Sequence, residues 1–332
     1  MNQFDPKIST VPLLQQVLAD LGNIQGAAEN FTADRVLNKE KLFPTVEDKS
    51  EPPRQLICYL SGPGGGGIDH SDAAPIGSML DSIGECENLD LMINSPGGSG
   101  EAAEKLIEMC RAHCRREFRV VVPNYAKSAA TMIALGADVI VMGYLSELGP
   151  IDPQYQISVG NTIQVVSGQS FVQAYENVQE EVKQAVAAGQ SPVGYLHSLS
   201  ASTMEPAFIE HCRRGIDFSR DIAKKFLPKY QFPALLRATG ETRHPSTLKK
   251  WAKRVAEDLL SANTRFSHGR LISADEAKDV GLHVDILDRQ DAAWGAYWEL
   301  YVRGEVYMQS RAVGDARVTK LFFDRTSTLP AY

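Results

Sequence analysis

The sequence of 332 residues lacks the features that mark several common classes of protein. Its 34 basic residues are outnumbered by 41 acidic ones, giving a net charge of −7, so it has no excess of positive charge with which to bind nucleic acid or an anionic membrane surface. No apolar run approaches the roughly 18 residues that cross a membrane, and the first 20 residues lack the basic segment followed by an apolar one that is typical of a secretion signal. We therefore expect a cytoplasmic protein with no nucleic-acid partner and no membrane span.

Cysteine is scarce and badly placed for structural roles. The five cysteines are an odd number and contain no C-x-x-C pair, which argues against a disulfide framework and against a zinc knuckle. Cys110, His113 and Cys114 share one face of a predicted helix and can be drawn as metal ligands, but small residues of a helical stripe are the better interpretation. We expect neither a metal nor another cofactor.

Phosphate-binding glycine motifs are also missing, although glycine-rich loops are present. The segment "NSPGGSGEAAEKL" at 94–106 follows an apolar run and precedes a helical pattern, so its glycines expose backbone N–H groups at a helix start. Such groups bind phosphate or stabilise the oxyanion that develops when a carbonyl is attacked. Neither this loop nor "GPGGGG" at 62–67 continues as G-x-G-x-x-G or GK[ST], which favours the oxyanion.

Short apolar runs alternate with helical patterns in the first half of the chain. The predicted strands lie at 54–60, 89–94, 118–124 and 138–143, and the predicted helices lie at 74–84, from just after Gly98, and at 126–137. This alternation predicts parallel βαβ units and an α/β fold.

Changes in pattern divide the chain into five segments. We expect a peripheral N-terminal arm at 1–50, a core at 51–160, a mostly helical lobe at 161–260, a return to the core at 261–290 and a C-terminal helix and tail at 291–332. In the returning segment Ser273 and Glu276 predict a capping box and Gly281 a helix end. The aromatic C-terminal helix packs on the core or forms a subunit contact.

Ser128 is the candidate nucleophile. It lies 31 residues after Gly97, where a strand turns into a helix of small residues. A serine there can simply cap the helix. Combined with N–H donors at Gly97, however, it fits the attacking group of an acyl transfer.

Four motifs in order, "INSPGGSGEAAEKL", "VPNYAKSAATMIALGAD", "ELGPIDPQ" and "HGRLISADEAKDVGLHVD", resemble the serine dehydrogenase proteinase family. This family belongs with signal peptide peptidase A and the Clp proteolytic subunits in the Clp/crotonase superfamily. The resemblance covers about 54–160 and 262–288. It implies a spiral of ββα units with a helical insertion and a C-terminal helix, Ser128 as nucleophile, and an oxyanion hole formed by the N–H groups of Gly97 and Ala129.

The general base is where the sequence departs from the Clp pattern. The position matching the Clp histidine is near Asp152, and the position matching the Clp aspartate is Gly269, beside His268. Relative to the Clp pattern, the acid and the imidazole have exchanged places along the chain. This exchange predicts a triad of Ser128, His268 as base and Asp152 as the group that orients the imidazole. The alternative is a serine–lysine dyad, with Lys183 the candidate by spacing and Lys127 a weaker one, or no competent base at all.

The resemblance implies a serine peptidase that cleaves polypeptides through an acyl-enzyme and forms a homo-oligomer enclosing a chamber. An unfoldase or adaptor would be a separate partner, since the chain has no ATPase motif. Two other classes of protein stay open. One is an inactive scaffold of the same fold. The other is a crotonase-type acyl-CoA enzyme, which would have no use for a serine at the helix start where Ser128 lies.

Overall fold

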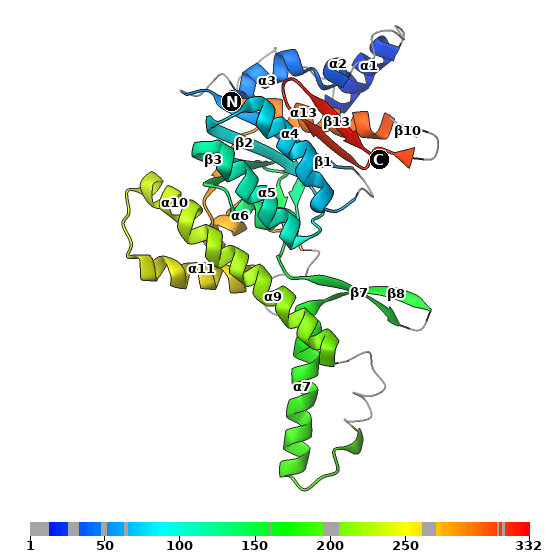
Figure 1. Cartoon of the computed structure of the whole chain (residues 1–332), viewed down its shortest axis with the longest axis vertical. Helices are drawn as coiled ribbons and strands as arrows, with labels where there is room; N and C mark the ends of the chain where they lie inside the picture. Colours follow the sequence, from blue (N-terminus) through cyan, green and yellow to red (C-terminus); the bar gives the residue numbers. More distant parts are fainter. Residues whose placement is uncertain are drawn as a thin grey trace, which may run out of the picture. The chain divides into compact units, whose positions relative to one another are not determined.

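The computed structural model describes residues 13–25, 33–47, 52–62, 66–159, 161–194, 206–260, 270–310, 312–313 and 316–332. The chain divides into two compact units (Figure 1). Unit 1 comprises Met1–Tyr125, Val141–Ser146 and Asp285–Tyr332, and unit 2 comprises Ala126–Ile140 and Glu147–Val284.

A seven-stranded sheet has the order β13-β12-β1-β2-β3-β5-β9. Its strands are β1 (Arg54–Ser61), β2 (Cys86–Asn94), β3 (Cys114–Val122), β5 (Val139–Met142), β9 (Val284–Ile286), β12 (Lys320–Phe323) and β13 (Thr328–Ala331). Strands β1, β2 and β3 are parallel, whereas β12 pairs antiparallel with β1. The predicted α/β fold with parallel βαβ units is therefore confirmed.

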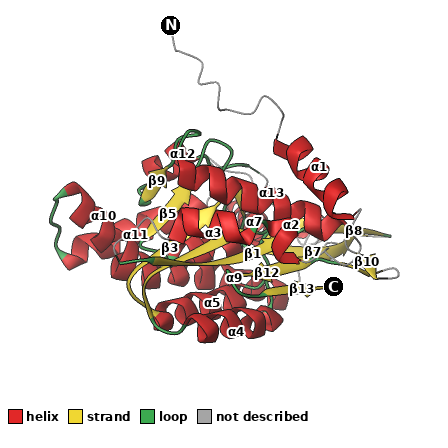
Figure 2. Cartoon of the chain, turned by 90° about the horizontal axis from the view of Figure 1, so that it is seen from above, coloured by secondary structure: helices red, strands yellow, loops and turns green. Residues whose placement is uncertain are grey.

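Helices of unit 1 cover opposite faces of this sheet (Figure 2). On one face α4 (Ala73–Ile83) packs against α5 (Gly100–His113). The α5 helix begins because the Ser99 hydroxyl caps it, accepting the Ala102 N–H at 3.1 Å. Its apolar residues recur at helical spacing and are buried against the sheet, namely Ala103, Leu106, Ile107 and Cys110.

The described part of the N-terminal arm, at 13–25 and 33–47, packs into unit 1, so the prediction of a peripheral arm is wrong for these residues. Its helices are α1 (Leu13–Gln25), α2 (Ala33–Leu37) and α3 (Lys39–Glu47), and all contact α13 (Ala292–Ser310). Val36 and Phe43 are fully buried. The Arg303 guanidinium donates to the Val36 carbonyl at 3.1 Å and to Asp20 at 2.8 Å. The aromatic C-terminal helix, α13, therefore packs on the core, which is the first of the two roles that the sequence allows for it.

Unit 2 contains a hairpin and a set of helices. The strands β7 (Gln154–Val159) and β8 (Thr162–Ser167) pair antiparallel, and the short strands β4 (Tyr125–Ala126) and β6 (Glu147–Leu148) form another pair. The helices are α6 (Ala129–Leu135), α7 (Gly168–Ala187), α9 (Pro206–Phe226), the π-helical turn η3 (Leu227–Gln231), α10 (Phe232–Thr239), α11 (Pro245–Leu260) and α12 (Ala274–Val280). The sequence predicts α6, α12 and a mostly helical lobe at 161–260, but it predicts neither each helix of that lobe nor the hairpin.

The predicted ends of α12 are confirmed. The Ser273 hydroxyl accepts the Glu276 N–H at 3.2 Å, and the Glu276 carboxylate accepts the Ser273 N–H at 3.0 Å. Gly281 ends the helix in the left-handed conformation, at φ +105. The remaining short strands, β10 (Ala312–Val313) and β11 (Ala316–Arg317), form a hairpin in unit 1.

Candidate active site

The glycine loop predicted to bind an oxyanion begins where β2 ends, in unit 1. The Asn94 side chain accepts the N–H of Tyr125 at 3.0 Å, and the Ser95 N–H donates to the Tyr125 carbonyl at 3.0 Å. These two bonds fix the start of the loop to the segment that follows β3. The loop is therefore built on the ends of two neighbouring parallel strands, as expected for a functional loop of an α/β sheet.

Gly97 and Gly98 have φ values of +106 and +145, which L side chains rarely adopt. The segment beside them is held by backbone bonds: the Ile68 N–H donates to the Gly97 carbonyl at 2.6 Å, and the Ser99 N–H donates to the Ile68 carbonyl at 2.7 Å. A Cβ placed on Gly98 would lie 2.3 Å from both the nitrogen and the oxygen of Ile68. Only glycine fits there.

The N–H groups of the two glycines differ. That of Gly97, the predicted donor, is directed to the Ser95 hydroxyl at 3.2 Å. That of Gly98 has no acceptor among the described residues. Of these two glycines, Gly98 therefore offers an N–H without an acceptor among the described residues, whereas a serine hydroxyl already accepts that of Gly97.

Ser128 occupies a strained position at the start of α6, in unit 2. Its backbone has φ +50 and ψ −115, and its hydroxyl makes no capping bond. A non-glycine residue in this region costs about 1–3 kcal/mol, which surrounding structure must offset. The side chain is partly exposed, and the adjacent Ala129 N–H has no acceptor among the described residues. Ser128 is thus not the ordinary helix cap that the sequence allowed.

Bonds at both ends hold α6 in place. Near its start the Thr131 hydroxyl lies 2.7 Å from the Ala126 carbonyl and 2.9 Å from the Gly149 carbonyl. At its end the buried Gln231 side chain donates to the Ala134 carbonyl at 3.4 Å and accepts the His283 N–H at 3.1 Å. Gln231 lies in the π-helical turn η3, so the helical lobe supports the helix that carries Ser128. Sequence reasoning missed both residues, because a threonine within a helix and a glutamine in an apolar segment carry no distinctive motif.

Asp152 is fully buried in unit 2. Its carboxylate accepts the Gln154 amide at 3.0 Å, and the preceding Ile151 N–H donates to the Leu259 carbonyl at 3.1 Å. His268, the predicted base, lies outside the described residues. The chain just beyond it is placed, because Ile272 and Leu148 exchange backbone bonds of 2.9 and 3.0 Å in an antiparallel bridge.

The lysines proposed as alternative bases are both paired with carboxylates. Lys183 projects from α7 with 73% of its side chain exposed, 3.8 Å from Glu180. Lys127 is half-buried, and its ammonium contacts Glu147 at 2.8 Å and donates to the Leu148 carbonyl at 3.1 Å. A lysine base must be desolvated and neutral.

Among the described residues, no group of three or more histidine, cysteine, aspartate or glutamate side chains is placed to hold a metal ion. The cluster drawn from Cys110, His113 and Cys114 is not such a group. Cys110 is buried in the stripe of α5, as the apolar interpretation predicts. None of the helices in the described ranges has the length and apolarity needed to span a bilayer.

These features define a class of α/β protein. Its sheet has parallel strands at its centre, a glycine loop precedes one helix, and a strained serine precedes another. Residues 66–182 match the model of the ClpP-like SDH-type serine proteinase family. Over this segment, the resemblance predicted from the motifs is confirmed.

Comparison with individual proteins gives shorter or weaker similarities. Two uncharacterized proteins of Methanocaldococcus jannaschii are 48% and 39% identical over 66 residues. These matches cover 20% of this chain and only 23% and 22% of the relatives. Two solved structures of the 1510-N membrane-bound stomatin-specific protease have TM-scores of 0.36. One is a serine-to-alanine variant, with 13% identity over 70% of this chain and 80% of that one. The other is a lysine-to-alanine variant with a substrate peptide, with 15% identity over 71% and 78%.

Proposed function

We propose that the chain is a serine peptidase in which the Ser128 hydroxyl attacks a peptide carbonyl and forms an acyl-enzyme. The observation that carries this proposal is the backbone of Ser128, held at φ +50 at the start of a buried helix with its hydroxyl uncapped. A sharp, strained turn from strand to helix is typical of nucleophilic serines, because it exposes the hydroxyl beside unpaired N–H groups. The match of residues 66–182 to a serine proteinase family supports the same chemistry.

The proposed oxyanion donors are the Ala129 N–H and the glycine pair that contains Gly97. Within the pair, Gly98 has the N–H without an acceptor, whereas that of Gly97 is directed to Ser95. A donor needs an unoccupied N–H directed at the position where negative charge develops. Gly98 is therefore the stronger candidate, and Gly97 would serve only after its bond to Ser95 is released.

The proposed base is His268, oriented by Asp152. The bridge between Leu148 and Ile272 supports this pairing, since Asp152 and His268 each lie four residues from one of its partners. A buried carboxylate such as Asp152 would hold the imidazole tautomer that accepts the serine proton. The imidazolium would then protonate the leaving amine, and water would hydrolyse the acyl-enzyme by the reverse proton path.

Labelling with an active-site-directed fluorophosphonate, followed by peptide mapping, tests these assignments. We expect labelling at Ser128 in the wild type, none in Ser128→Ala, and loss in His268→Ala and Asp152→Ala. Lys183→Ala, which removes an exposed cation, should label normally. Loss of labelling in Lys183→Ala alone would identify the lysine as the base. Absence of labelling in the wild type would contradict the peptidase and favour the inactive scaffold of this fold.

We further propose that the protein is cytoplasmic and acts on polypeptides as a homo-oligomer. The hairpin in unit 2 supports self-association, because Ile163 and Val165 on β8 are 73% and 62% exposed. Exposed apolar side chains on a two-stranded hairpin favour a partner surface. Light scattering on the wild type and on Ile163→Lys with Val165→Lys tests this: the oligomer should dissociate in the double variant, and a monomeric wild type would contradict the proposal.

A further inference from the structure

One segment of this acidic chain is strongly basic. Between Arg243 and Arg254 the sequence contains five basic residues and no acidic one, although the net charge of the chain is −7. The segment forms the turn before α11 and the first half of that helix. None of the catalytic residues proposed above lies in this segment.

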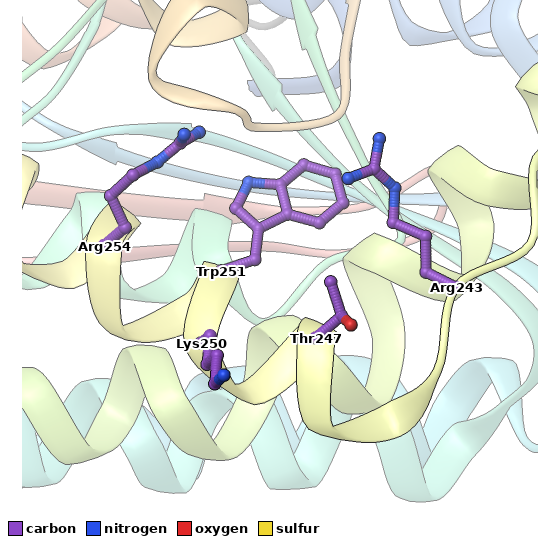
Figure 3. Close-up of a pocket in the computed structure, with 5 residues that line it drawn as sticks. All are labelled: Arg243, Thr247, Lys250, Trp251 and Arg254. Carbon is purple, nitrogen blue, oxygen red and sulfur yellow. The ribbon is translucent and has the colours of Figure 1, made fainter.

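Part of this basic segment lines a pocket of about 460 Å³ in unit 2. The lining residues are Arg243, Thr247, Lys250, Trp251 and Arg254 (Figure 3). Figure 3 shows the side chains of Arg243 and Arg254 flanking the indole of Trp251. A pocket of this size with three cations and one hydroxyl is suited to a ligand that carries several negative oxygens.

Two of the three cations are free to bind such a ligand. Lys250 and Arg254 are exposed and form no ion pair with a described residue. Arg243 is paired with Glu241 at 3.0 Å. The Thr247 hydroxyl adds a neutral donor that has no partner among the described residues.

The aromatic residue of the pocket is already engaged. Phe232 stacks on Trp251 with ring centroids 4.1 Å apart and an angle of 7°, and the Arg243 guanidinium lies 5.2 Å from an indole centroid. Little of the indole remains to stack on a nucleotide base, so the pocket favours an anion without a ring. From Thr247 to Arg254 the helix rises about 10 Å, and alternate side chains of an extended peptide are about 7 Å apart. Successive carboxylates of such a peptide match this spread of cations better than one small anion does.

We infer that this basic pocket on α11 binds acidic segments of polypeptides. Lys250 and Arg254 pair with two carboxylates of the segment, and Thr247 donates to a third oxygen. That the bound segment belongs to a substrate or an adaptor rests on the proposed peptidase function. The binding itself does not, because the pocket contains neither Ser128 nor the glycine loop.

Fluorescence anisotropy of a labelled hexaglutamate peptide tests the inference, using the full chain carrying Ser128→Ala so that no cleavage occurs. We expect saturable binding that weakens as salt increases, and none to a hexaglutamine peptide. Lys250→Glu with Arg254→Glu should weaken binding at least about tenfold, because each attraction becomes a repulsion. The matched control is Lys105→Glu with Arg116→Glu, which reverses two exposed cations, one on α5 and one on β3, and should bind as the parent does.

Equal losses in the two double variants would overturn the inference, because binding would then follow net charge alone. It would also be overturned if the peptide did not bind, or if pyrophosphate bound and the peptide did not. Circular dichroism of both double variants confirms that they fold. Failure of fluorophosphonate labelling at Ser128 would refute the peptidase and leave this binding result unaffected.

Discussion

The Ile68 N–H donates to the Gly97 carbonyl at 2.6 Å, and this contact leaves no room for a side chain on Gly98. The two segments run parallel through a single bridge, so the loop before α4 determines where the glycine N–H groups point. The conformation at Gly98, one of the proposed oxyanion donors, therefore depends on a neighbour 30 residues earlier in the chain.

Gly98→Ala should remove labelling at Ser128 and lower the free energy of unfolding by at least about 2 kcal/mol, since it adds a backbone clash to an unfavourable φ. Gly84→Ala is the matched control: Gly84 has φ +71, but nothing lies within 4 Å of its added Cβ. It should cost about 1 kcal/mol and leave labelling intact. Equal effects of the two substitutions in urea unfolding would contradict the role given to Ile68.

Two substitutions of Ser128 distinguish the backbone strain at this position from the chemical role of its hydroxyl. Both Ser128→Ala and Ser128→Gly remove the hydroxyl, so neither should label. Glycine adopts φ +50 freely and alanine does not, so Ser128→Gly should be more stable than Ser128→Ala by about 1 kcal/mol. Thermal unfolding of the two variants provides the comparison, and a more stable alanine variant would show that the backbone at this position is not strained.

Gln231→Met tests the support of α6. Methionine fills a similar volume but leaves the His283 N–H without its acceptor, and an unsatisfied buried donor costs about 1–3 kcal/mol. We expect that loss of stability and slower labelling at Ser128. Gln184→Met, at an exposed position on α7, should change neither quantity. Unaltered labelling in Gln231→Met would mean that the lobe does not position the serine.

Glu305 makes stability depend on pH. Burial raises the pKa of its carboxyl to about 7. The folded state then holds a proton that the unfolded state has released, so the stability contributed by this group is present below about pH 4 and is lost as pH rises towards 7. Glu305→Gln should match the wild type at pH 4 and exceed it at pH 8 by about 1–2 kcal/mol, after allowance for the partial exposure of the carboxyl. Identical urea midpoints at pH 8 would refute this.

Local signals in the sequence were sufficient for the parallel strands and for the ends of several helices. The apolar run before Asn94 and the capping box at Ser273 each depend on neighbouring residues, which is why both predictions are confirmed. For the candidate site, the motifs single out Ser128 and the glycine loop, whose roles stay predictions. The bond from Gly97 to Ser95 depends on loop geometry that no spacing reveals.

Long-range contacts explain what the sequence did not predict. Strand β12 has only four residues and pairs with β1, about 260 residues earlier in the chain. Local periodicity therefore does not predict it. Its Lys320 is a buried cation held at 2.7 Å by both Asp69 and Asp72, and this pairing lowers the pKa of Asp69 to about 2. The hairpin at 154–167 was missed because its strand β8 is mostly exposed.

The central claim is that Ser128 forms the acyl-enzyme, and trapping that intermediate tests it most directly. The protein would be quenched in acid during turnover of a p-nitrophenyl ester, digested and mapped by mass spectrometry. The acyl group is predicted on the peptide that contains Ser128, with a stoichiometry near one per chain, and should be absent from Ser128→Ala. Ester turnover with the acyl group on another residue, or unchanged in Ser128→Ala, would contradict the assignment.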